Sequence, residues 1–258
     1  MGNTALVTGA SSGIGAEFAR YHAERGGDVI LVARRGDALQ ALKEELEKDH
    51  GIAAHVFAQD LGAEGGAQNL YDQVKGAGLG VDVLINNAGF GGQGRHLDRP
   101  LEDELAMIDL NVKALVTLTH LVARDMVAQG SGKILQVGST AGFMPGPNQA
   151  VYFATKAFVR SYAEALAQEL KGTGVTMTLL APGYVETEFA ERSGLTGTKL
   201  VSGGGKTPRS VAKHGYDAMR RGEMVTVNEK GLDLMVNWVV PFLPRKAVLR
   251  MIERMQAK

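Results

Sequence analysis

Cysteine is absent from this chain of 258 residues. Without thiols the protein can form no disulfide, iron–sulfur cluster or thiolate zinc site, and it has no cysteine nucleophile. A secreted scaffold held together by disulfides is therefore excluded. We expect a reducing compartment, the cytoplasm.

An excess of one charge and a long apolar run are also missing. The 28 Lys and Arg residues equal the 28 Asp and Glu residues, so no global positive field can neutralise a nucleic-acid backbone. The most apolar late stretch, 236–244, is about half as long as a membrane-spanning helix. We therefore expect neither a secreted nor a transmembrane protein, and no nucleic acid as main partner.

Short apolar runs alternate with amphipathic stretches along the chain. Runs rich in Val, Ile and Leu without polar alternation predict strands buried on both faces of a sheet; these are 4–8, 28–33, 53–58, 81–86, 133–138 and 175–180. Helices are predicted between them, at 15–25, 37–49, 64–75, 101–129 (one helix or two) and 151–171. This alternation predicts an α/β fold, a single Rossmann-type doubly wound domain over residues 1–258 with helices on both faces of a parallel sheet.

Glycine is abundant, with 34 residues, close to twice the usual share of about 7%. Several cluster directly after the first strand, in Thr8-Gly9-Ala10-Ser11-Ser12-Gly13-Ile14-Gly15. Glycines let a backbone turn tightly and approach a pyrophosphate, and the N-terminus of the following helix offers free N–H groups. A glycine-rich turn alone discriminates poorly, but its place between a strand and a helix favours a dinucleotide cradle.

The end of the second strand distinguishes the two nicotinamide coenzymes. An NAD site usually has Asp or Glu here for the ribose 2′-hydroxyl, whereas this chain has Arg34 and Arg35. A guanidinium pairs with a 2′-phosphate that a carboxylate would repel. The arginines therefore favour NADP(H) over NAD(H), the alternative being that they are solvated charges at a strand end.

Two Tyr-x-x-x-Lys pairs occur, Tyr71/Lys75 and Tyr152/Lys156. This spacing puts both side chains on one helix face, where an ammonium can lower the pKa of the phenol. Only the second pair has a serine thirteen residues earlier, Ser139, just past a predicted strand. We interpret Tyr71/Lys75 as an exposed helix pair and Tyr152/Lys156 as part of a reacting centre.

Seven motifs now stand in order. They are Thr8-Gly9-x3-Gly13-x-Gly15, Asp60-Leu61, Asn86-Asn87-Ala88-Gly89, Asn111, Ser139, Tyr152-x3-Lys156 and Pro182-Gly183. In this order they resemble the classical short-chain dehydrogenase/reductase (SDR) family from about residue 4 to 190, and Arg34-Arg35 resembles its NADP-preferring branch. Gly138-Ser139 departs mildly from the frequent Ser-Ser pair.

The resemblance implies a role for each catalytic residue. Tyr152 would be the general acid that protonates a carbonyl oxygen, and the base in reverse. Lys156 would lower the pKa of Tyr152 and hold the nicotinamide ribose, and Ser139 would orient the carbonyl. Asn111 would seat a water linking Lys156 to solvent; from the sequence alone, an Asn that satisfies a helix kink is an equal alternative.

The resemblance also implies a coenzyme site and a substrate site. For NADP(H) the residues would be Gly9, Ser11, Ser12, Gly13, Ile14, Gly15, Arg34, Arg35, Asp60, Leu61, Asn87, Ala88, Gly89, Tyr152, Lys156, Pro182, Gly183, Val185 and Thr187. For the substrate they would be Ser139 with an apolar wall of Phe90, Phe143, Met144, Tyr184 and Phe189, each of which could equally be ordinary core. The histidines show no metal-ligand spacing, so no metal is expected.

Two late segments stand out. The Gly/Ser/Thr-rich stretch 192–208 is predicted to be a mobile substrate lid inside the domain. Residues 199–258 hold 12 Lys/Arg and 5 Asp/Glu, and 245–258 reads as a basic amphipathic helix with Val248, Leu249, Ile252 and Met255 on one face. We expect that face to pack on the chain or on a second subunit of a dimer or tetramer; weak peripheral contact with an anionic membrane is the alternative.

Three functions fit these observations. The first is an NADP(H)-dependent oxidoreductase that transfers hydride between nicotinamide and a hydrophobic ketone, aldehyde or secondary alcohol. The second is a catalytically silent NADP(H) sensor, which would not need Ser139, Tyr152 and Lys156 together. The third is a 3-oxoacyl-carrier-protein reductase, which needs a basic docking patch; Lys199, Lys206 and Arg209 are its candidates, although a solvated flexible loop explains these charges as well.

Overall fold

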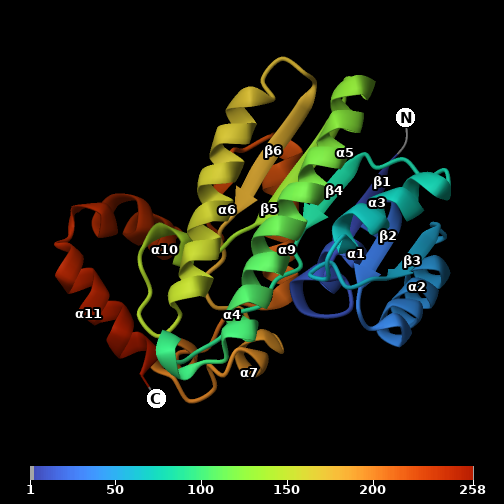
Figure 1. Ribbon diagram of the computed structural model, residues 1–258. Coiled ribbons are helices and arrows are strands. Elements are labelled where there is room, and N and C mark those ends of the chain that lie inside the picture. The colour runs from blue at the N-terminus through green and yellow to red at the C-terminus, as the bar shows by residue number, and fades with distance from the viewer. Residues whose placement is uncertain (1–2, 258) are drawn as a thin grey trace.

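The computed structural model describes residues 3–257. Its centre is a parallel sheet of seven strands in the order β3-β2-β1-β4-β5-β6-β7 (Figure 1). The strands are β1 (Thr4–Thr8), β2 (Asp28–Ala33), β3 (Ala54–Ala58), β4 (Val83–Asn86), β5 (Gly132–Val137), β6 (Val175–Leu180) and β7 (Val225–Thr226). Strand order reverses direction between β1 and β4, which opens a crevice beyond their carboxyl ends. The predicted doubly wound α/β fold is confirmed.

Six of the seven strands match the predicted apolar runs to within two residues. The exception, β7, was not predicted because two residues carry no periodic signal. It pairs in parallel with β6 through Leu179–Val225 and Leu180–Thr226 and closes one edge of the sheet.

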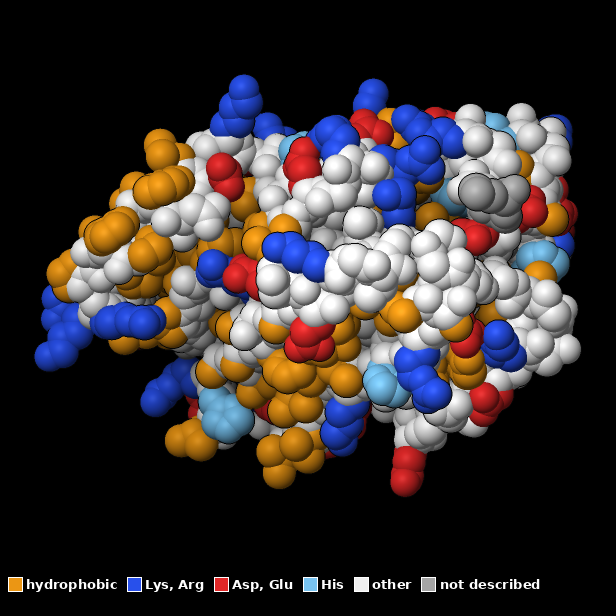
Figure 2. Space-filling model, turned by 90° about the horizontal axis from the view of Figure 1, so that it is seen from above, with side chains coloured by type: hydrophobic (Ala, Val, Ile, Leu, Met, Phe, Trp, Pro, Cys, Tyr) orange, Lys and Arg blue, Asp and Glu red, His pale blue; other side chains and the backbone are white. Residues whose placement is uncertain are grey.

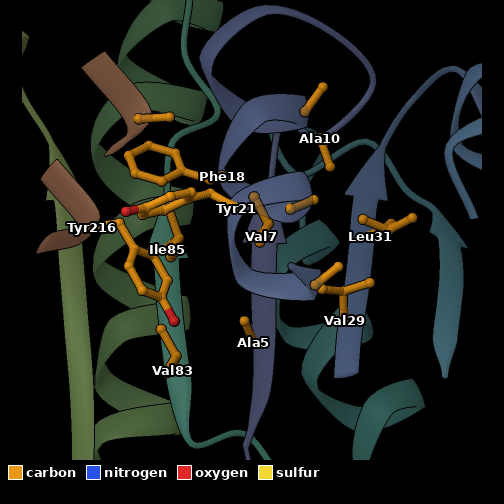
Figure 3. Close-up of a cluster of buried hydrophobic side chains, with 14 of the residues drawn as sticks. Ala5, Val7, Ala10, Phe18, Tyr21, Val29, Leu31, Val83, Ile85 and Tyr216 are labelled. Atoms are coloured by element: carbon orange, nitrogen blue, oxygen red, sulfur yellow. The ribbon is translucent and has the colours of Figure 1, made fainter. Parts of the chain in front are cut away.

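Helices cover both faces of the sheet. Against one face pack α1 (Gly13–Ala23), α2 (Gly36–His50) and α9 (Pro208–Arg221). Against the other pack α3 (Gly66–Gly76), α5 (Leu115–Gln129) and α6 (Ala150–Glu169). Figure 3 shows the first of these cores, where Phe18, Tyr21 and Tyr216 lie over Val7 and Ile85 of the sheet. Burial of both sheet faces explains why the strands lack polar alternation.

A single helix of three parts runs from Leu101 to Gln129. It consists of α4 (Leu101–Ile108), a π-helical turn η2 (Asp109–Ala114) and α5, so the alternative of two separate helices is wrong. The helix is long and apolar enough to cross a membrane by length and composition. Its buried side chains Leu118, Val122 and Met126 pack in the core beside β4 and β5.

The last part of the chain folds back over the carboxyl ends of the strands (Figure 1). It comprises α10 (Lys230–Leu234), a π-helical turn η4 (Met235–Val239), a 3-10 turn η5 (Val240–Phe242) and α11 (Arg245–Gln256). Val248 and Ile252 of α11 are buried against Met107, Tyr152 and Phe153 of the same chain. The expected apolar face of α11 therefore packs within the chain, although Leu249 and Met255 stay partly exposed.

Candidate active site

One large cavity of about 1060 Å³ runs along the carboxyl edge of the sheet. Its walls come from the loops after β1, β2, β3, β4, β5 and β6 and from the C-terminal segment. Open parallel sheets bind their ligands at this position, because the loops that follow the carboxyl ends of the strands meet there. The cavity is larger than a pocket for one small molecule needs, so coenzyme and substrate can share it.

The glycine-rich turn fits a pyrophosphate cradle. Gly9 and Gly13 have φ of 70° and 55°, in the left-handed region, which L side chains rarely adopt. A Cβ on Gly9 would lie 2.8 Å from Asn87 Nδ2, and one on Gly15 would lie 2.2 Å from the Gly9 carbonyl oxygen. The turn thus lies directly on the loop after β4, and the first turn of α1 contains no acidic residue. An anionic ligand can approach the backbone N–H groups there.

Hydrogen bonds from Asn87 hold the loop after β4 against the end of β1. Its Nδ2 donates to the Thr8 carbonyl oxygen at 2.9 Å, and its backbone N–H donates to Thr8 Oγ1 at 2.9 Å. The neighbouring Asn86 side chain instead turns into the core, where Nδ2 donates to Thr119 Oγ1 at 2.9 Å. Asn87, Ala88 and Gly89 line the cavity, and Asn86 does not.

Arg34 and Arg35 stand at the end of β2 beside the cradle, and both line the cavity. Arg34 is 74% exposed, and its Nη1 lies 3.9 Å from Asp60 Oδ2. Arg35 is held more firmly, since Nε donates to Ser11 Oγ at 3.2 Å and Nη1 lies 3.3 Å from Glu188 Oε2. Two guanidinium groups therefore border the cavity at the end of β2, next to the glycine-rich turn.

The side chains of Ser139 and Tyr152 interact with each other, and both residues line the cavity. Ser139 is the N-cap of the 3-10 turn η3 (Thr140–Phe143), and its Oγ accepts from the Ala141 N–H at 3.1 Å. Tyr152 lies in the first turn of α6, and its ring centroid is 5.6 Å from that of Phe189. Burial raises the pKa of the Tyr152 phenol to about 12, and the interaction with Ser139 lowers it by less.

Lys156 lies one helical turn beyond Tyr152 and is buried. Its Nζ donates to the Val137 carbonyl oxygen at 2.9 Å and lies 5.8 Å from the centre of the Tyr152 ring. Burial lowers the pKa of Lys156 to about 8. The expected lowering of the Tyr152 pKa by Lys156 is not seen, because desolvation dominates for both groups.

Asn111 lies in the π-helical turn η2 and is buried. Its Oδ1 accepts from the Phe90 N–H at 3.1 Å, and its Nδ2 donates to the Phe90 carbonyl oxygen at 2.9 Å and to Thr155 Oγ1 at 3.2 Å. Asn111 thereby ties the loop after β4 to helix α6. It lies beside Gly89, where a Cβ would be 2.9 Å from Asn111 Oδ1 and 3.6 Å from Lys156 Nζ.

The second tyrosine–lysine pair has a different setting. Tyr71 and Lys75 lie on α3, and both side chains reach Asp125 Oδ2 of α5 at 3.0 Å. Lys75 is half exposed, and neither residue lines the large cavity. The pair lies away from the cavity, as interpreted from the sequence, but it is not simply exposed: Tyr71 is half-buried, and both residues join α3 to α5 through Asp125.

Nearly all the proposed coenzyme and substrate residues come together on the cavity wall. Three residues do not line it: Gly15, Asn111 and Phe143. Gly15 lies behind the turn, against Gly9. Phe143 differs from the expectation of a substrate contact, because it packs near Ala181 and Val227 with the Arg160 guanidinium 3.8 Å above its ring.

The C-terminal part of the substrate wall was missed by the sequence reasoning. Seven of its residues line the cavity: Leu232, Met235, Val236, Met251, Ile252, Met255 and Gln256. Gln256 is buried; its Nε2 donates to Gln149 Oε1 at 2.8 Å, and its carbonyl oxygen accepts from Gln93 Nε2 at 3.1 Å. The sequence shows Val248, Leu249, Ile252 and Met255 as one apolar face, but it does not say what that face packs against, and it gives no signal for Met251 or Gln256.

A family model described as short chain dehydrogenase matches residues 3–196. The chain belongs to the short-chain dehydrogenase family. It is therefore an oxidoreductase that acts on CH–OH and C=O groups and binds a nicotinamide nucleotide. The matched residues contain the cradle, both arginines, Ser139, Tyr152 and Lys156.

This short-chain dehydrogenase is similar to reductases with different substrates. It is 40% identical over 191 residues to sulfoacetaldehyde reductase 2 of Chromohalobacter salexigens, covering 73% of this chain and 75% of that protein. It is 39% identical over 188 residues to the NADP-dependent 3-hydroxy acid dehydrogenase YdfG of Salmonella typhi, covering 72% and 74%. The two names show that close relatives differ in the compound they convert.

Solved short-chain dehydrogenases have the same fold over almost the whole chain. One from Sphingobium yanoikuyae in complex with NADPH superposes with a TM-score of 0.82 at 30% identity, covering 94% of this chain and 96% of that one. Another, from Burkholderia phymatum in complex with NAD, gives a TM-score of 0.82 at 25% identity, covering 91% and 92%. Both nicotinamide coenzymes thus occur among the similar structures.

Proposed function

We propose that this short-chain dehydrogenase is an NADP(H)-dependent carbonyl reductase, or alcohol dehydrogenase in reverse, for hydrophobic ketones and aldehydes. The observation that carries the proposal is the meeting of Ser139, Tyr152 and Lys156 on one cavity wall that is otherwise largely apolar. A nicotinamide coenzyme would supply or accept the hydride at the carbonyl carbon. The residues of the chain supply binding, orientation and the proton.

Tyr152 suits the role of acid in reduction. Its raised pKa keeps the phenol protonated at neutral pH, so a proton is available when negative charge develops on the carbonyl oxygen. Ser139 Oγ can donate to the same oxygen, since its present acceptor, the Pro182 carbonyl oxygen, is 3.5 Å away and weakly held. Lys156 lies behind both and can hold ribose hydroxyls.

The substrate half of the cavity is lined by large apolar side chains. Phe90, Met144, Phe189, Leu232 and Met251 contribute to it. Such a wall favours an apolar carbonyl compound, because each buried methylene stabilises binding by about 0.8 kcal/mol.

A small anionic substrate has less support. The basic residues lining this half, Arg192 and Lys206, already pair with Glu188 at 2.6 Å and with Glu229 at 3.7 Å. A sulfonate or carboxylate would have to displace these carboxylates. Neither Arg192 nor Lys206 therefore offers an unpaired cation to such a group.

The coenzyme preference rests on Arg34 and Arg35. Both guanidinium groups border the cavity, and Arg34 makes only a loose contact with Asp60. A 2′-phosphate would gain charge-assisted hydrogen bonds from them. This favours NADP(H) over NAD(H).

The two alternative functions are weaker. A silent sensor does not need the Ser139, Tyr152 and Lys156 set. A carrier-protein reductase needs free basic groups, but Lys206 pairs with Glu229, and Arg209 pairs with Glu24 at 2.5 Å. Of the three candidates only Lys199 has no ion pair among the described residues.

A cytoplasmic homo-oligomer is also part of the proposal. Leu97, Leu101 and Leu105 are exposed on η1 (His96–Asp98) and α4, and they offer an apolar surface to a second copy. Sedimentation of the wild type and of Leu101→Asp would test this, with a lower molecular mass expected for the variant.

The direct test is a panel of carbonyl compounds with NADPH, with coenzyme oxidation followed by near-ultraviolet absorbance. Ketones with bulky apolar groups should turn over faster than short anionic aldehydes. Tight NADPH binding with no turnover on any compound would instead support the sensor, and a requirement for carrier-bound substrates would support the carrier-protein reductase.

A further inference from the structure

The C-terminal segment leaves an apolar surface uncovered. Six neighbouring residues of α10, η4 and η5 and the turn after them form this surface, which we call the C-terminal apolar surface: Leu234, Met235, Trp238, Val239, Phe242 and Leu243. Trp238 is 68% exposed and Phe242 is 80% exposed. Between them, Val236 and Val240 point inward and are buried. The segment is thus amphipathic, with its inner face packed on the chain and its outer face bare.

Basic side chains border this surface. Lys230 begins α10, Arg245 and Lys246 begin α11, and Arg250 follows one turn later. Among the ion pairs of residues 3–257, none involves these four side chains. Figure 2 shows hydrophobic side chains gathered at the left end of the molecule, where Figure 1 places α10 and α11, with Lys and Arg side chains beside them.

We propose that the C-terminal apolar surface docks on an anionic lipid bilayer. Apolar side chains with tryptophan, bordered by lysine and arginine, match the boundary between acyl chains and negatively charged headgroups. Each basic residue near such a surface contributes roughly fivefold in binding. The protein as a whole carries no net charge, so this attraction is local to the segment.

A second copy of the chain fits the same surface less well. In a two-fold dimer the same patch faces itself, so the four basic residues of one copy would approach those of the other. Like charges facing each other disfavour association. A negatively charged membrane has the opposite, complementary charge.

The surface is continuous with the active-site cavity. Met235, which lines the cavity together with Leu232, is 42% exposed and directly follows the exposed Leu234. Docking would therefore turn one side of the substrate chamber toward the bilayer, where apolar carbonyl compounds dissolve. This consequence rests on the proposed function, whereas docking itself does not.

Trp238 provides the measurement, because it is the only tryptophan in the chain. The full-length protein, without coenzyme or substrate, is mixed with vesicles of phosphatidylcholine alone or with one third phosphatidylglycerol. With the anionic vesicles we expect a blue shift of Trp238 emission and co-flotation of the protein, both reduced by added salt. Neutral vesicles should bind much more weakly.

Variants identify the surface. Phe242→Asp should abolish flotation, and Arg245→Glu with Lys246→Glu should weaken it by about 25-fold or more, from two contributions of roughly fivefold each. Met224→Asp and Lys171→Glu are matched controls at the opposite, amino edge of the sheet, and they should float like the wild type. NADPH affinity in solution reports that each variant is folded.

Three results would overturn the proposal. They are unchanged Trp238 emission with anionic vesicles, equal binding to neutral vesicles, and a blue shift that appears without lipid as protein concentration rises. The last would assign the surface to a second copy. Because none of these readouts uses turnover, a failed reductase assay leaves the docking result intact.

Discussion

The coenzyme preference can be tested at Arg34. The Arg34 side chain is 74% exposed, and its only ion pair, with Asp60, spans 3.9 Å. Such an exposed contact contributes about 0–1 kcal/mol, whereas charge-assisted hydrogen bonds contribute about 1.5–3 kcal/mol. When NADPH binds, Arg34 would exchange its contact with Asp60 for hydrogen bonds to the 2′-phosphate. The net gain in binding free energy is about 1.4 kcal/mol, a factor of ten in affinity. Arg34→Ala should therefore weaken NADPH binding about tenfold and leave NADH binding unchanged.

Arg35 should contribute less. Its guanidinium already bonds Ser11 and pairs with Glu188 at 3.3 Å, so binding a 2′-phosphate requires it to loosen those contacts. Arg35→Ala should change the NADPH to NADH affinity ratio by only about threefold, well below the tenfold that one full charge-assisted contact represents. Arg34→Asp should have the largest effect, because it replaces attraction with repulsion.

The assay is titration of each coenzyme against each variant at fixed ionic strength. Arg95→Ala is a matched control, since Arg95 is 79% exposed and also lies 3.9 Å from one carboxylate, Asp98, but does not line the cavity. If the ratio of NADPH to NADH affinity stays constant for Arg34→Ala, Arg35→Ala and the double variant, the 2′-phosphate does not bind at Arg34 and Arg35.

Four further predictions follow from the site and the core. Tyr152→Phe should reduce turnover by about 10²- to 10⁴-fold with NADPH affinity retained, and Tyr71→Phe should have no effect; equal rates for wild type and Tyr152→Phe would disprove the acid. NADPH affinity should fall as pH rises through about 8, because Lys156 then loses its proton, and titrations of Lys156→Met should show a flatter pH profile. Gly215→Ala should lower the free energy of unfolding in urea by about 1–3 kcal/mol, because its Cβ would lie 2.6 Å from Leu180 Cδ2. Protease cutting within 193–208 should slow when NADPH and substrate are both present, and equal cutting with and without them would contradict a lid.

The sequence predicts the sheet well, and most of the residues it proposes for the coenzyme line one cavity, because both depend on local signals. Buried strands need continuous apolar runs, and the turn at Gly9 and Gly13 needs residues that adopt positive φ. Tyr152 could be separated from Tyr71 because Ser139 stands at a strand end. Each of these features is recognisable within a short stretch of sequence. The parallel sheet then brings them together, because the carboxyl ends of its strands lie at one edge.

The substrate half could not be read in the same way. Phe143 and Phe90 are both aromatic residues in loops after strands, yet Phe143 packs under Arg160 and Phe90 lines the cavity. The direction of a loop side chain depends on contacts distant in sequence. Likewise, whether α11 covers the cavity depends on Gln256 meeting Gln93 and Gln149, more than a hundred residues away.

The hydrogen bonds of Gln256 also affect where a tag can be attached and when the cavity is completed during synthesis. A segment attached after Ala257 would follow one residue beyond Gln256, whose hydrogen bonds hold α11 at the cavity, whereas a segment attached before Asn3 would leave from the amino edge of the sheet, next to β1. During synthesis the whole nucleotide site emerges before Gln256 does. A ribosome-bound chain could therefore acquire its coenzyme while the chamber for the second reactant is still unfinished.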